Sequence, residues 1–404
     1  MCSAATHTDT KSFKKKFSLA SFFNQHWDKY IQNPHHPVTT VQYKAVDAIR
    51  KCRTEALGKN IYTCNDCGHR VEVFHSCKNR FCPNCSWADT VNWARIVYNH
   101  LLNVPHRHVV MTLPHSLNYL IRRNNRFFFN TILSVGSTLM KDFIRSKYHV
   151  QPGIISVLHT FGERKNLHVH VHMIVSWGGI DKEKNRLTSI PVSDRVDYPK
   201  LKDIFRATVI KAIDKAYNND TLEHNFKDAL QYKDFSESLF KTPWILHLEP
   251  PMNVPEQVIR YIGRYSKRAC LSEYKITNIE GEYISFRYKD YKQKDNDRKY
   301  SEKIIRLHYY EFFPLLLQHV PLSNFRLVRY YGMYATKSKI LEEFKSKAAY
   351  TELPSGSSPS DPTKICSNCS GKMTFTESKS EKGSVLWYIQ NKKEKKLRKQ
   401  KIAA

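Results

Sequence analysis

The segment LHVHVHMIV at residues 167–175 constrains the fold of this chain more than any other. Apolar residues and histidines alternate along it. Because successive side chains of a β-strand point to opposite faces of a sheet, the pattern predicts a strand with one apolar and one histidine face. The apolar face must pack against covering helices. We therefore expect the histidines on the opposite, open face of the sheet.

Five further segments show the periodicity of regular elements. Strands are predicted at 106–114, 153–161 and 243–250, where β-branched and apolar residues are concentrated. Amphipathic spacing predicts helices over about 118–147 and 199–217. These elements surround the histidine strand in the order strand, helix, strand, strand, helix, strand.

That order is typical of a ferredoxin-like fold. The class expected is therefore α+β, with an antiparallel sheet resembling that of RNA-recognition domains, whose open face can bind nucleic acid. The connection Gly162–Asn166 is short and polar, so it predicts a hairpin between the second and third strands. Asn253 and Glu256 form a capping-box pattern that predicts one more helix, running to about Arg268.

Two Cys-x-x-Cys pairs, Cys64/Cys67 and Cys82/Cys85, are separated only by the short segment 68–81. Each pair can place two thiolates on one ion, and two pairs complete the tetrahedron that structural Zn²⁺ prefers. The four cysteines therefore predict a zinc site in an N-terminal module. Because the chain shows no signal peptide and no apolar run of membrane-spanning length, a reducing cytoplasm is expected, where thiolates are favoured over disulfides.

The remaining cysteines and nearby histidines are ambiguous. Four of them are Cys52, Cys77, His69 and His75. They can hold a second ion or replace one of the four ligands. Alternatively, some of them are small buried residues or surface histidines that bind no metal. Cys366 and Cys369 form one more pair, and no second pair follows it. An ion at that pair would need ligands from elsewhere in the chain.

The charge balance indicates a polyanionic partner. The chain has 65 Lys and Arg against 37 Asp and Glu, a formal net charge of +28. Such an excess favours nucleic acid, because each phosphate contact releases counterions. A basic protein of ribosomes or membrane surfaces is the other class compatible with it. The basic run at 392–404 is either a solvated tail or a DNA-binding arm.

The histidine strand and a later helix together predict phosphodiester chemistry. Two imidazoles at i and i+2 of a strand can share one divalent cation, which can polarise a phosphodiester. Tyr261 and Tyr265 lie one helical turn apart and supply a nucleophile. Basic residues that favour a phenolate and offer phosphate contacts surround them: Arg260, Arg264, Lys267 and Arg268. Two aromatics at this spacing are also typical of core packing.

Four motifs together resemble the HUH-superfamily rolling-circle transposases of the insertion-sequence-ninety-one type. They are TLP at 112–114, HVHMIVSWGG at 170–179, YIGRY at 261–265 and FRYKDY at 286–291. The family's zinc-binding layout is similar to CRTEALG, CNDCGH and SCKNRFCPNC in this chain. The resemblance covers the chain from about residue 40 to about residue 340.

The resemblance implies a mechanism. His170 and His172 would hold Mg²⁺ or Mn²⁺, while Tyr261 and Tyr265 nick and religate DNA through a 5′-phosphotyrosine bond. A third metal ligand is expected, with His168, His159 and Glu249 as candidates. The implied substrate is single-stranded DNA at the ends of a mobile element, read partly from a hairpin. The implied setting is the bacterial nucleoid, with no membrane partner.

Two other functions are compatible with parts of the sequence. A non-enzymatic zinc-ribbon DNA-binding protein would leave the histidine and tyrosine motifs unexplained. A replication initiator or relaxase uses the same nicking chemistry, and only the family layout argues against it. We expect a zinc-binding DNA-recognition domain at 1–100, the HUH core at 101–270, a C-terminal part of the transposase domain at 271–345, and a linker with a basic tail at 346–404.

Overall fold

The central sheet of the molecule has five strands in the order β13-β5-β6-β3-β9, and every neighbouring pair is antiparallel. The strands are β3 (His106–Thr112), β5 (Gly153–Phe161), β6 (Leu167–Ser176), β9 (Ile245–Leu248) and β13 (Val328–Gly332). The computed structural model describes residues 17–35, 37–98, 101–181, 183–184, 186–252, 258, 269–294, 300–335 and 365–379.

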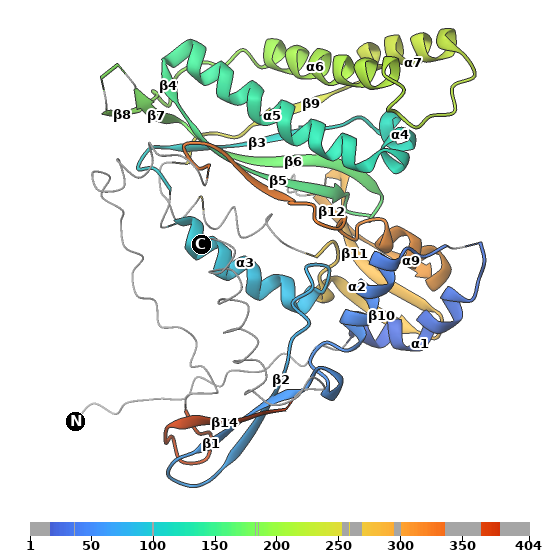
Figure 1. Cartoon of the computed structure of the whole chain (residues 1–404), viewed down its shortest axis with the longest axis vertical. Helices are drawn as coiled ribbons and strands as arrows, with labels where there is room; N and C mark the ends of the chain where they lie inside the picture. The colour runs from blue at the N-terminus through green and yellow to red at the C-terminus, as the bar shows by residue number, and fades with distance from the viewer. Residues whose placement is uncertain are drawn as a thin grey trace, which may run out of the picture.

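One face of this sheet forms the largest core. Val169, Val171 and Met173 are at most 1% exposed and pack against helices that lie on one side of the sheet (Figure 1). Those helices are α4 (Asn118–Arg123), α5 (Asn125–Tyr148), α6 (Tyr198–Asn218) and α7 (Ala229–Lys241). The predicted α+β class, with an antiparallel sheet and alternating faces, is confirmed.

The helix predicted over 118–147 is interrupted at Asn124. Its backbone leaves the helical region, with φ −117° and ψ 40°. Its side chain donates to the backbone oxygens of Leu120 at 3.0 Å and Glu223 at 2.7 Å. Asparagine side chains compete with helical hydrogen bonds in this way, so α4 and α5 form separately.

The opposite face of the sheet is not fully open, which corrects the expectation from the alternation. Trp93 and Val97 of α3 (Pro83–Tyr98) pack on Ile155, Val157 and Ile174. Figure 1 shows α3 on the side of the sheet away from α5 and α6. The histidines of β6 precede Ile174 along the strand. They are half-buried beside this second core and are not fully exposed to solvent.

A third core joins the N-terminal helices to a later part of the chain. Helices α1 (Leu19–Ile31) and α2 (Thr40–Arg50) pack with α9 (Tyr309–Leu317). The rings of Phe23 and Phe313 stack with centroids 4.9 Å apart. This core also includes residues of the sheet β10 (Ile276–Glu280), β11 (Tyr283–Lys294) and β12 (Tyr300–His308). Two segments assigned to separate domains from the sequence thus share one core.

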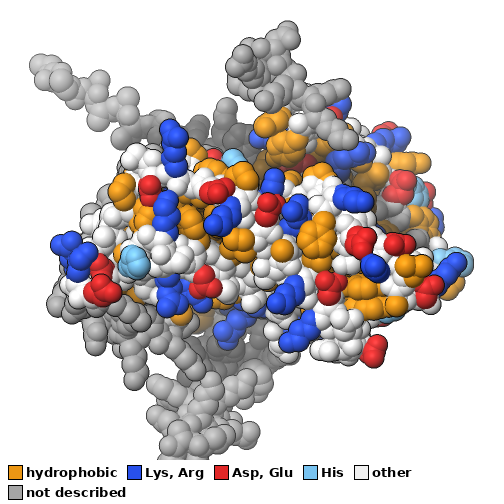
Figure 2. Space-filling view, turned by 90° about the horizontal axis from the view of Figure 1, so that it is seen from above, with side chains coloured by type: hydrophobic (Ala, Val, Ile, Leu, Met, Phe, Trp, Pro, Cys, Tyr) orange, Lys and Arg blue, Asp and Glu red, His pale blue; other side chains and the backbone are white. Residues whose placement is uncertain are grey.

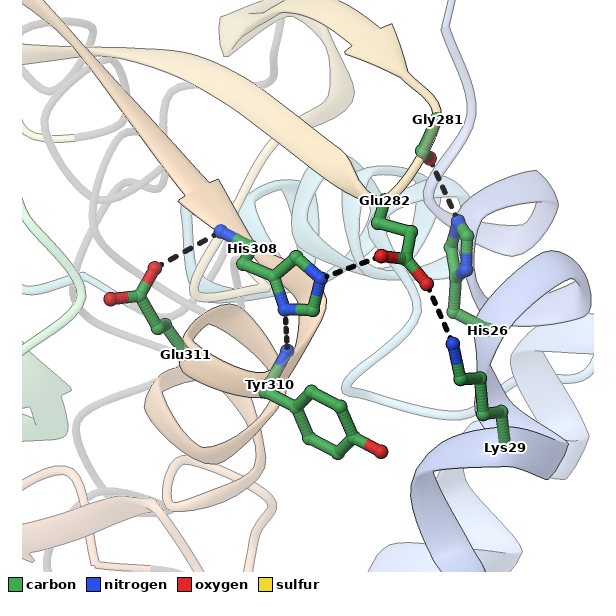
Figure 3. A network of polar contacts seen from close by, with 7 residues as sticks. All are labelled: His26, Lys29, Gly281, Glu282, His308, Tyr310 and Glu311. Atoms are coloured by element: carbon green, nitrogen blue, oxygen red, sulfur yellow. Dashed lines mark hydrogen bonds and ion pairs between the residues drawn. The ribbon is translucent and has the colours of Figure 1, made fainter.

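Polar contacts tie the same two segments together (Figure 3). Lys29 Nζ lies 2.7 Å from Glu282 Oε1, and His308 Nε2 donates to Glu282 Oε2 at 3.1 Å. Glu282 therefore links α1 to the end of β12. His26 Nε2 adds a contact to the backbone oxygen of Gly281 at 3.0 Å.

Segments from opposite ends of the chain meet in a small sheet with the order β14-β1-β2. Its strands are β1 (Lys59–Cys64), β2 (Arg70–Phe74) and β14 (Met373–Lys379). The sequence predicts a linker and a basic tail at 346–404, but residues 365–379 within that range form part of this sheet instead. The sequence did not reveal this because local periodicity contains no information about a partner strand so distant in the chain.

The remaining elements are short. Strands β4 (Val150–Gln151), β7 (Gly178–Asp181) and β8 (Arg186–Ser189) form a sheet of their own, and the 3-10 turns are Glu55–Leu57, His115–Leu117 and Glu273–Lys275. On the face seen in Figure 2, Lys and Arg are interspersed with Asp and Glu, so the net charge does not make this face uniformly basic. Among the described residues, no helix combines the length and the apolar character needed to cross a membrane.

Candidate metal centres and active site

Strand pairing gathers histidines from three strands on one face of the central sheet. His170 of β6 lies directly opposite His159 of β5, and His172 follows two residues later on the same face. On the other side of β6, His108 of β3 comes from a strand whose odd-numbered residues Val109 and Met111 face the helical core. The imidazoles of His108, His159, His170 and His172 thus come together from three strands that are distant in sequence.

His159, His170 and His172 form a group that can hold a metal ion, because one ring nitrogen of each lies within 4.8 Å of the others. Their ring centroids are 4.7 to 5.3 Å apart. Three imidazoles at this spacing match the nitrogen ligand sets of divalent transition metals. The group could therefore supply three ligands to one ion.

Hydrogen bonds orient two of these rings. His170 Nδ1 lies 2.9 Å from the backbone oxygen of His168, so Nδ1 carries the proton and Nε2 keeps its lone pair. His172 Nδ1 lies 2.9 Å from His108 Nε2. If His172 donates in this bond, its Nε2 also keeps a lone pair for a metal, which is the usual outer-shell arrangement of metal-binding histidines.

The protonation states fit metal binding. Burial and the neighbouring imidazoles hold the pKa of His170 and of His172 well below the ordinary value. Burial lowers the pKa of His108 to about 3. At neutral pH these rings are therefore uncharged, and neutral imidazole is the form that ligates a metal.

The structure separates the three candidates for a third ligand. His159 belongs to the histidine group, whereas His168 does not. The ring of His168 lies between those of His170 and His115, with centroids 5.0 and 5.1 Å away. Glu249 lies 3.3 Å from His247 and is also outside the group. Among the three candidates, the structure therefore favours His159 over His168 as the third ligand, because strand pairing places His159 opposite His170.

A further histidine on this face has a structural partner. His106 Nε2 accepts from the hydroxyl of Tyr334 at 2.7 Å, and that hydroxyl accepts from the backbone N–H of Leu102 at 3.0 Å. Burial lowers the pKa of His106 to about 4. His106 therefore joins β3 to the end of β13 and stays neutral.

The predicted nucleophiles and their basic neighbours lie outside the described residues: Tyr261, Tyr265, Arg260, Arg264, Lys267 and Arg268. The described residues on either side of them are anchored. Met252 pairs with His106, and Val258 is 1% exposed among the residues that pack on the histidine side of the sheet. Ala269 donates its N–H to Ser86 Oγ of α3 at 3.1 Å.

A pocket adjoins the histidine group. His159 forms part of its wall together with Arg80, Phe81, Cys270 and His319. Ala269 and Cys270, the first described residues after the tyrosines in sequence, line this pocket together with His159. Arg80 offers a guanidinium for an anionic ligand here.

Lys165, in the turn between β5 and β6, adds a second cation near this pocket. It is 3% exposed, and its Nζ lies 5.3 Å from the ring of Phe161, another pocket residue. Burial lowers its pKa to about 8, so most of its charge persists at neutral pH. Sequence reasoning missed Lys165, because it stands in no recognisable motif. Arg80 lies within the cysteine-rich segment SCKNRFCPNC, where a basic side chain suits DNA contact.

His108 was missed as well, although a signal existed. His106 and His108 in HRHVV repeat the i, i+2 spacing of the later histidine strand. That spacing predicts two histidines on one face of β3. Only the pairing of β3 with β6 shows that His108 reaches His172.

The cysteines form two groups, not one. Cys52, Cys77, Cys82 and Cys85 make up the first, and their sulfurs lie within 4.8 Å of one another. Sulfur pairs in it are 3.5 to 3.8 Å apart. A tetrahedral ion with sulfur ligands at about 2.3 Å places the sulfurs about 3.8 Å apart, so the group fits Zn²⁺. Cys82 and Cys85 sit at the start of α3.

The second group contains Cys64, Cys67, Cys366 and Cys369. Cys64 Sγ lies 3.5 Å from Cys369 Sγ, and Cys67 Sγ lies 3.6 Å from Cys366 Sγ. The prediction that Cys64/Cys67 and Cys82/Cys85 share one tetrahedron is therefore wrong. Each pair has other partners, because β1 and β2 carry Cys64 and Cys67 away from α3.

Comparisons with known proteins agree with this architecture. Residues 22–113 match a family described as "Transposase zinc-binding domain", and residues 153–340 match one described as "Putative transposase". The chain is 28% identical over 327 residues to "Putative transposase y4qJ" of Sinorhizobium fredii, covering 79% of this chain and 80% of the relative.

A second relative is the "Transposase for insertion sequence element IS801" of Pseudomonas savastanoi pv. phaseolicola. It is 25% identical over 327 residues, covering 78% of this chain and 75% of the relative. No solved structure matches the chain. The cysteine groups and the matched segments together define a zinc-binding, DNA-processing enzyme. The chain belongs to the transposases of the insertion-sequence-ninety-one type, which carry an N-terminal zinc-binding domain.

Proposed function

We propose that this transposase nicks and religates single-stranded DNA at the ends of its element, with a tyrosine as nucleophile and a divalent ion bound by histidines. The observation that carries the proposal is the group His159, His170 and His172, whose nitrogens lie within 4.8 Å of one another. The tyrosine segment supports it, because the described residues on both sides of that segment lie on the histidine side of the sheet.

The ligands of the divalent ion would be the Nε2 atoms of His170 and His172, with His159 as the third ligand. When bound, Mg²⁺ or Mn²⁺ supplies a Lewis acid that polarises the scissile phosphate. Three imidazoles without a carboxylate in the described group favour Mn²⁺ over Mg²⁺, since Mg²⁺ prefers oxygen ligands. The remaining coordination positions would be left to water and phosphate oxygens.

The chemistry conserves the energy of the bond that it breaks. The phenolate oxygen of Tyr261 or Tyr265 attacks the phosphorus, a Tyr–O–P bond forms, and the P–O3′ bond breaks. The released 3′ oxygen takes up a proton and becomes a free 3′-OH. Attack of a 3′-OH on the phosphotyrosine reverses the step and seals the strand, so no nucleotide cofactor is consumed.

Cations of the chain would hold the DNA backbone during this step. Arg260, Arg264, Lys267 and Arg268 flank the tyrosines in sequence. Arg80 forms part of the wall of the pocket beside His159, and Lys165 lies buried near it. Guanidinium groups bind phosphate oxygens in pairs and would fix the strand for in-line attack. A partly hairpin-shaped element end would present such a single strand.

The test is a covalent-adduct assay. The protein is incubated with single-stranded DNA from the element end and Mn²⁺, then denatured in SDS, and the protein–DNA adduct is measured on a gel. Wild type should form an adduct, and the double variant Tyr261→Phe, Tyr265→Phe should form none. The single variants show which tyrosine attacks first.

Two controls separate chemistry from folding. Tyr274→Phe removes the hydroxyl of a tyrosine that is 66% exposed and should leave adduct formation unchanged. Zinc content should be the same in all variants. Absence of an adduct with wild type would refute the enzymatic proposal, and an adduct with the double variant would refute the tyrosine assignment. Double-stranded DNA of the same sequence should react more slowly.

A further inference from the structure

The Cys366/Cys369 pair is unexplained by the proposed function, and it lies outside both segments that match known families. The structure nevertheless places it against Cys64/Cys67, with the four sulfurs within 4.8 Å of one another. The two pairs lie near opposite ends of the chain. Their juxtaposition is therefore a product of folding and not of local sequence.

The turn at Cys64 has the hydrogen bonds of a metal-binding knuckle. The N–H of Cys64 donates to the backbone oxygen of His69 at 2.8 Å, and the N–H of Gly68 donates to the oxygen of Cys64 at 3.1 Å. Gly68 adopts φ +70°, which glycine allows without strain. This turn points Cys64 and Cys67 toward the same place.

The turn at Cys366 repeats that pattern residue by residue. The N–H of Cys366 donates to the oxygen of Gly371 at 2.8 Å, and the N–H of Ser370 donates to the oxygen of Cys366 at 2.9 Å. Ser370 also has a positive φ, of +59°, although it is not glycine. The N–H of Asn368 lies 3.4 Å from Cys366 Sγ, a contact that stabilises a thiolate.

Strand pairing brings the two turns together. β14 pairs with β1 along its length, from Cys64 opposite Met373 to Lys59 opposite Lys379. The N–H of Asn65 donates to the oxygen of Lys372 at 3.1 Å. The two similar turns therefore stand side by side at one end of the sheet.

Apolar packing alone gives this sheet little stability. Among the described residues, its hydrophobic cluster has three buried members, Cys64, Cys366 and Met373, with Tyr62 and Val71 half-buried against them, and Ile61 of β1 is buried as well. A core of that size cannot offset the entropy of ordering a strand, and structures this small generally need a metal or disulfides. The sulfurs are 3.5 and 3.6 Å apart across the pairs, far beyond the roughly 2.05 Å of a disulfide.

We propose that Cys64, Cys67, Cys366 and Cys369 hold one zinc ion that fastens the C-terminal segment to the N-terminal zinc-binding domain. Four thiolates with the observed cross-pair separations of 3.5 and 3.6 Å suit tetrahedral Zn²⁺. Two ligands come from each end of the chain, so the ion closes a loop that contains the whole histidine sheet. This zinc is separate from the one that Cys52, Cys77, Cys82 and Cys85 would bind.

Metal content of the purified full-length protein provides the first test. Zinc is measured by mass spectrometry after removal of loosely bound ions. Wild type should carry two zinc ions per chain, and Cys366→Ser/Cys369→Ser should carry one. Cys64→Ser/Cys67→Ser should also carry one, and the quadruple variant should still carry one, because both pairs serve the same ion. Cys270→Ala, a buried cysteine outside both groups, should keep two.

Other stoichiometries would overturn the proposal. Two ions in Cys366→Ser/Cys369→Ser would show that the C-terminal pair is not a ligand, and one ion in wild type would show that the second site does not form. A quadruple variant without zinc would place the two pairs on different ions.

A second test keeps all cysteines and so does not depend on the folding of a variant. A protease site is inserted within residues 351–360, the chain is cut, and its fragments are analysed by size exclusion. With zinc the C-terminal fragment should remain bound, and after chelation it should dissociate. The same cut in Cys366→Ser/Cys369→Ser should release the fragment even with zinc present. Release of the C-terminal fragment from the wild-type protein in zinc would refute the proposal that a zinc ion joins the two segments. Full retention of the fragment after metal removal would also refute it.

Discussion

His108 Nε2 lies 2.9 Å from His172 Nδ1, and the two rings stack with an interplanar angle of 18° across strands β3 and β6. Both rings are neutral at physiological pH, because burial lowers the pKa of His108 to about 3 and that of His172 well below its ordinary value. One of two neutral imidazoles must donate and the other accept. Metal binding through His172 Nε2 requires His172 to donate, so His108 is a positioning residue for the proposed ligand.

Removal of this acceptor should weaken metal binding. His108→Phe keeps a planar ring but cannot accept a hydrogen bond, so His172 loses its fixed orientation. We expect the Mn²⁺ affinity to fall by about 10- to 100-fold, the usual effect of losing an outer-shell partner. Mn²⁺ titration followed by electron paramagnetic resonance measures it without DNA.

Two variants serve as comparisons for His108→Phe. His108→Gln retains an acceptor near the position of Nε2 and should recover part of the affinity. His247→Ala removes a histidine that is 59% exposed in its side chain and outside the metal group, and should change nothing. An unchanged affinity in His108→Phe would show that the bond has no role in metal binding.

The choice between His159 and His168 as the third ligand gives a second prediction. His159→Ala should lower Mn²⁺ affinity and adduct formation together, because it removes one of three nitrogens within 4.8 Å. His168→Ala should leave Mn²⁺ affinity nearly unchanged, because His168 is outside the group of nitrogens that lie within 4.8 Å of one another, although its ring centroid is 5.0 Å from that of His170. The reverse order of effects in the same titration would restore His168 as the ligand.

The periodicity of a sequence describes each strand by itself, and this limits how much of the site could be predicted. Alternation along residues 167–175 correctly separated the core face from the histidine face, because that property belongs to one strand. The partner of His170 depends on which strand lies beside β6 and in what register. That information is distributed over β5 and β3, so the alternation along β6 leaves His159 as one of three candidates and does not indicate His108.

The cysteines show the same limit over a longer distance. Two Cys-x-x-Cys pairs close in sequence favour a shared ion, because closure of a short loop costs little entropy. In the structure Cys64/Cys67 instead meet Cys366/Cys369, where pairing of β1 with β14 brings distant segments together. The sequence does contain one indication of this arrangement. Cys366/Cys369 is a third Cys-x-x-Cys pair, and two thiolates alone do not complete a zinc site, so the pair needs ligands from elsewhere in the chain.

The shared core of the N-terminal helices and α9 leads to a stability prediction. Phe313 is fully buried, and its ring contacts those of Phe22, Phe23, Trp27 and Tyr30 of α1 at centroid distances of 4.9 to 5.9 Å. Phe313→Ala should lower the free energy of unfolding by about 3 to 5 kcal/mol, because it removes a large buried ring and leaves a cavity.

Urea denaturation followed by tryptophan fluorescence measures this change, since Trp27 belongs to the affected core. Phe240→Ala is the matched control, because Phe240 is 46% exposed and its loss should change the free energy of unfolding by at most about 0.5 kcal/mol. Equal effects of the two substitutions would mean that α1 and α9 do not share a core.

The contacts of Glu282 predict how stability depends on pH. Hydrogen bonds from Lys29 and His308 lower the pKa of Glu282 to about 2, below the value of about 4.3 for an unfolded glutamate. A depressed folded pKa means that the carboxylate stabilises the protein above the unfolded pKa. This contribution is lost as the pH falls from about 4.3 through about 2, because the unfolded state then binds the proton first.

The measurement compares urea midpoints of wild type and Glu282→Gln between pH 7 and pH 2. Wild type should be more stable above about pH 4.5, and the difference should shrink and vanish as the pH approaches 2. Glu280→Gln is the control, because Glu280 is more exposed and its nearest cation, Arg306, lies 3.9 Å away. A difference between wild type and Glu282→Gln that persists unchanged to pH 2 would exclude the ionised carboxylate as its source.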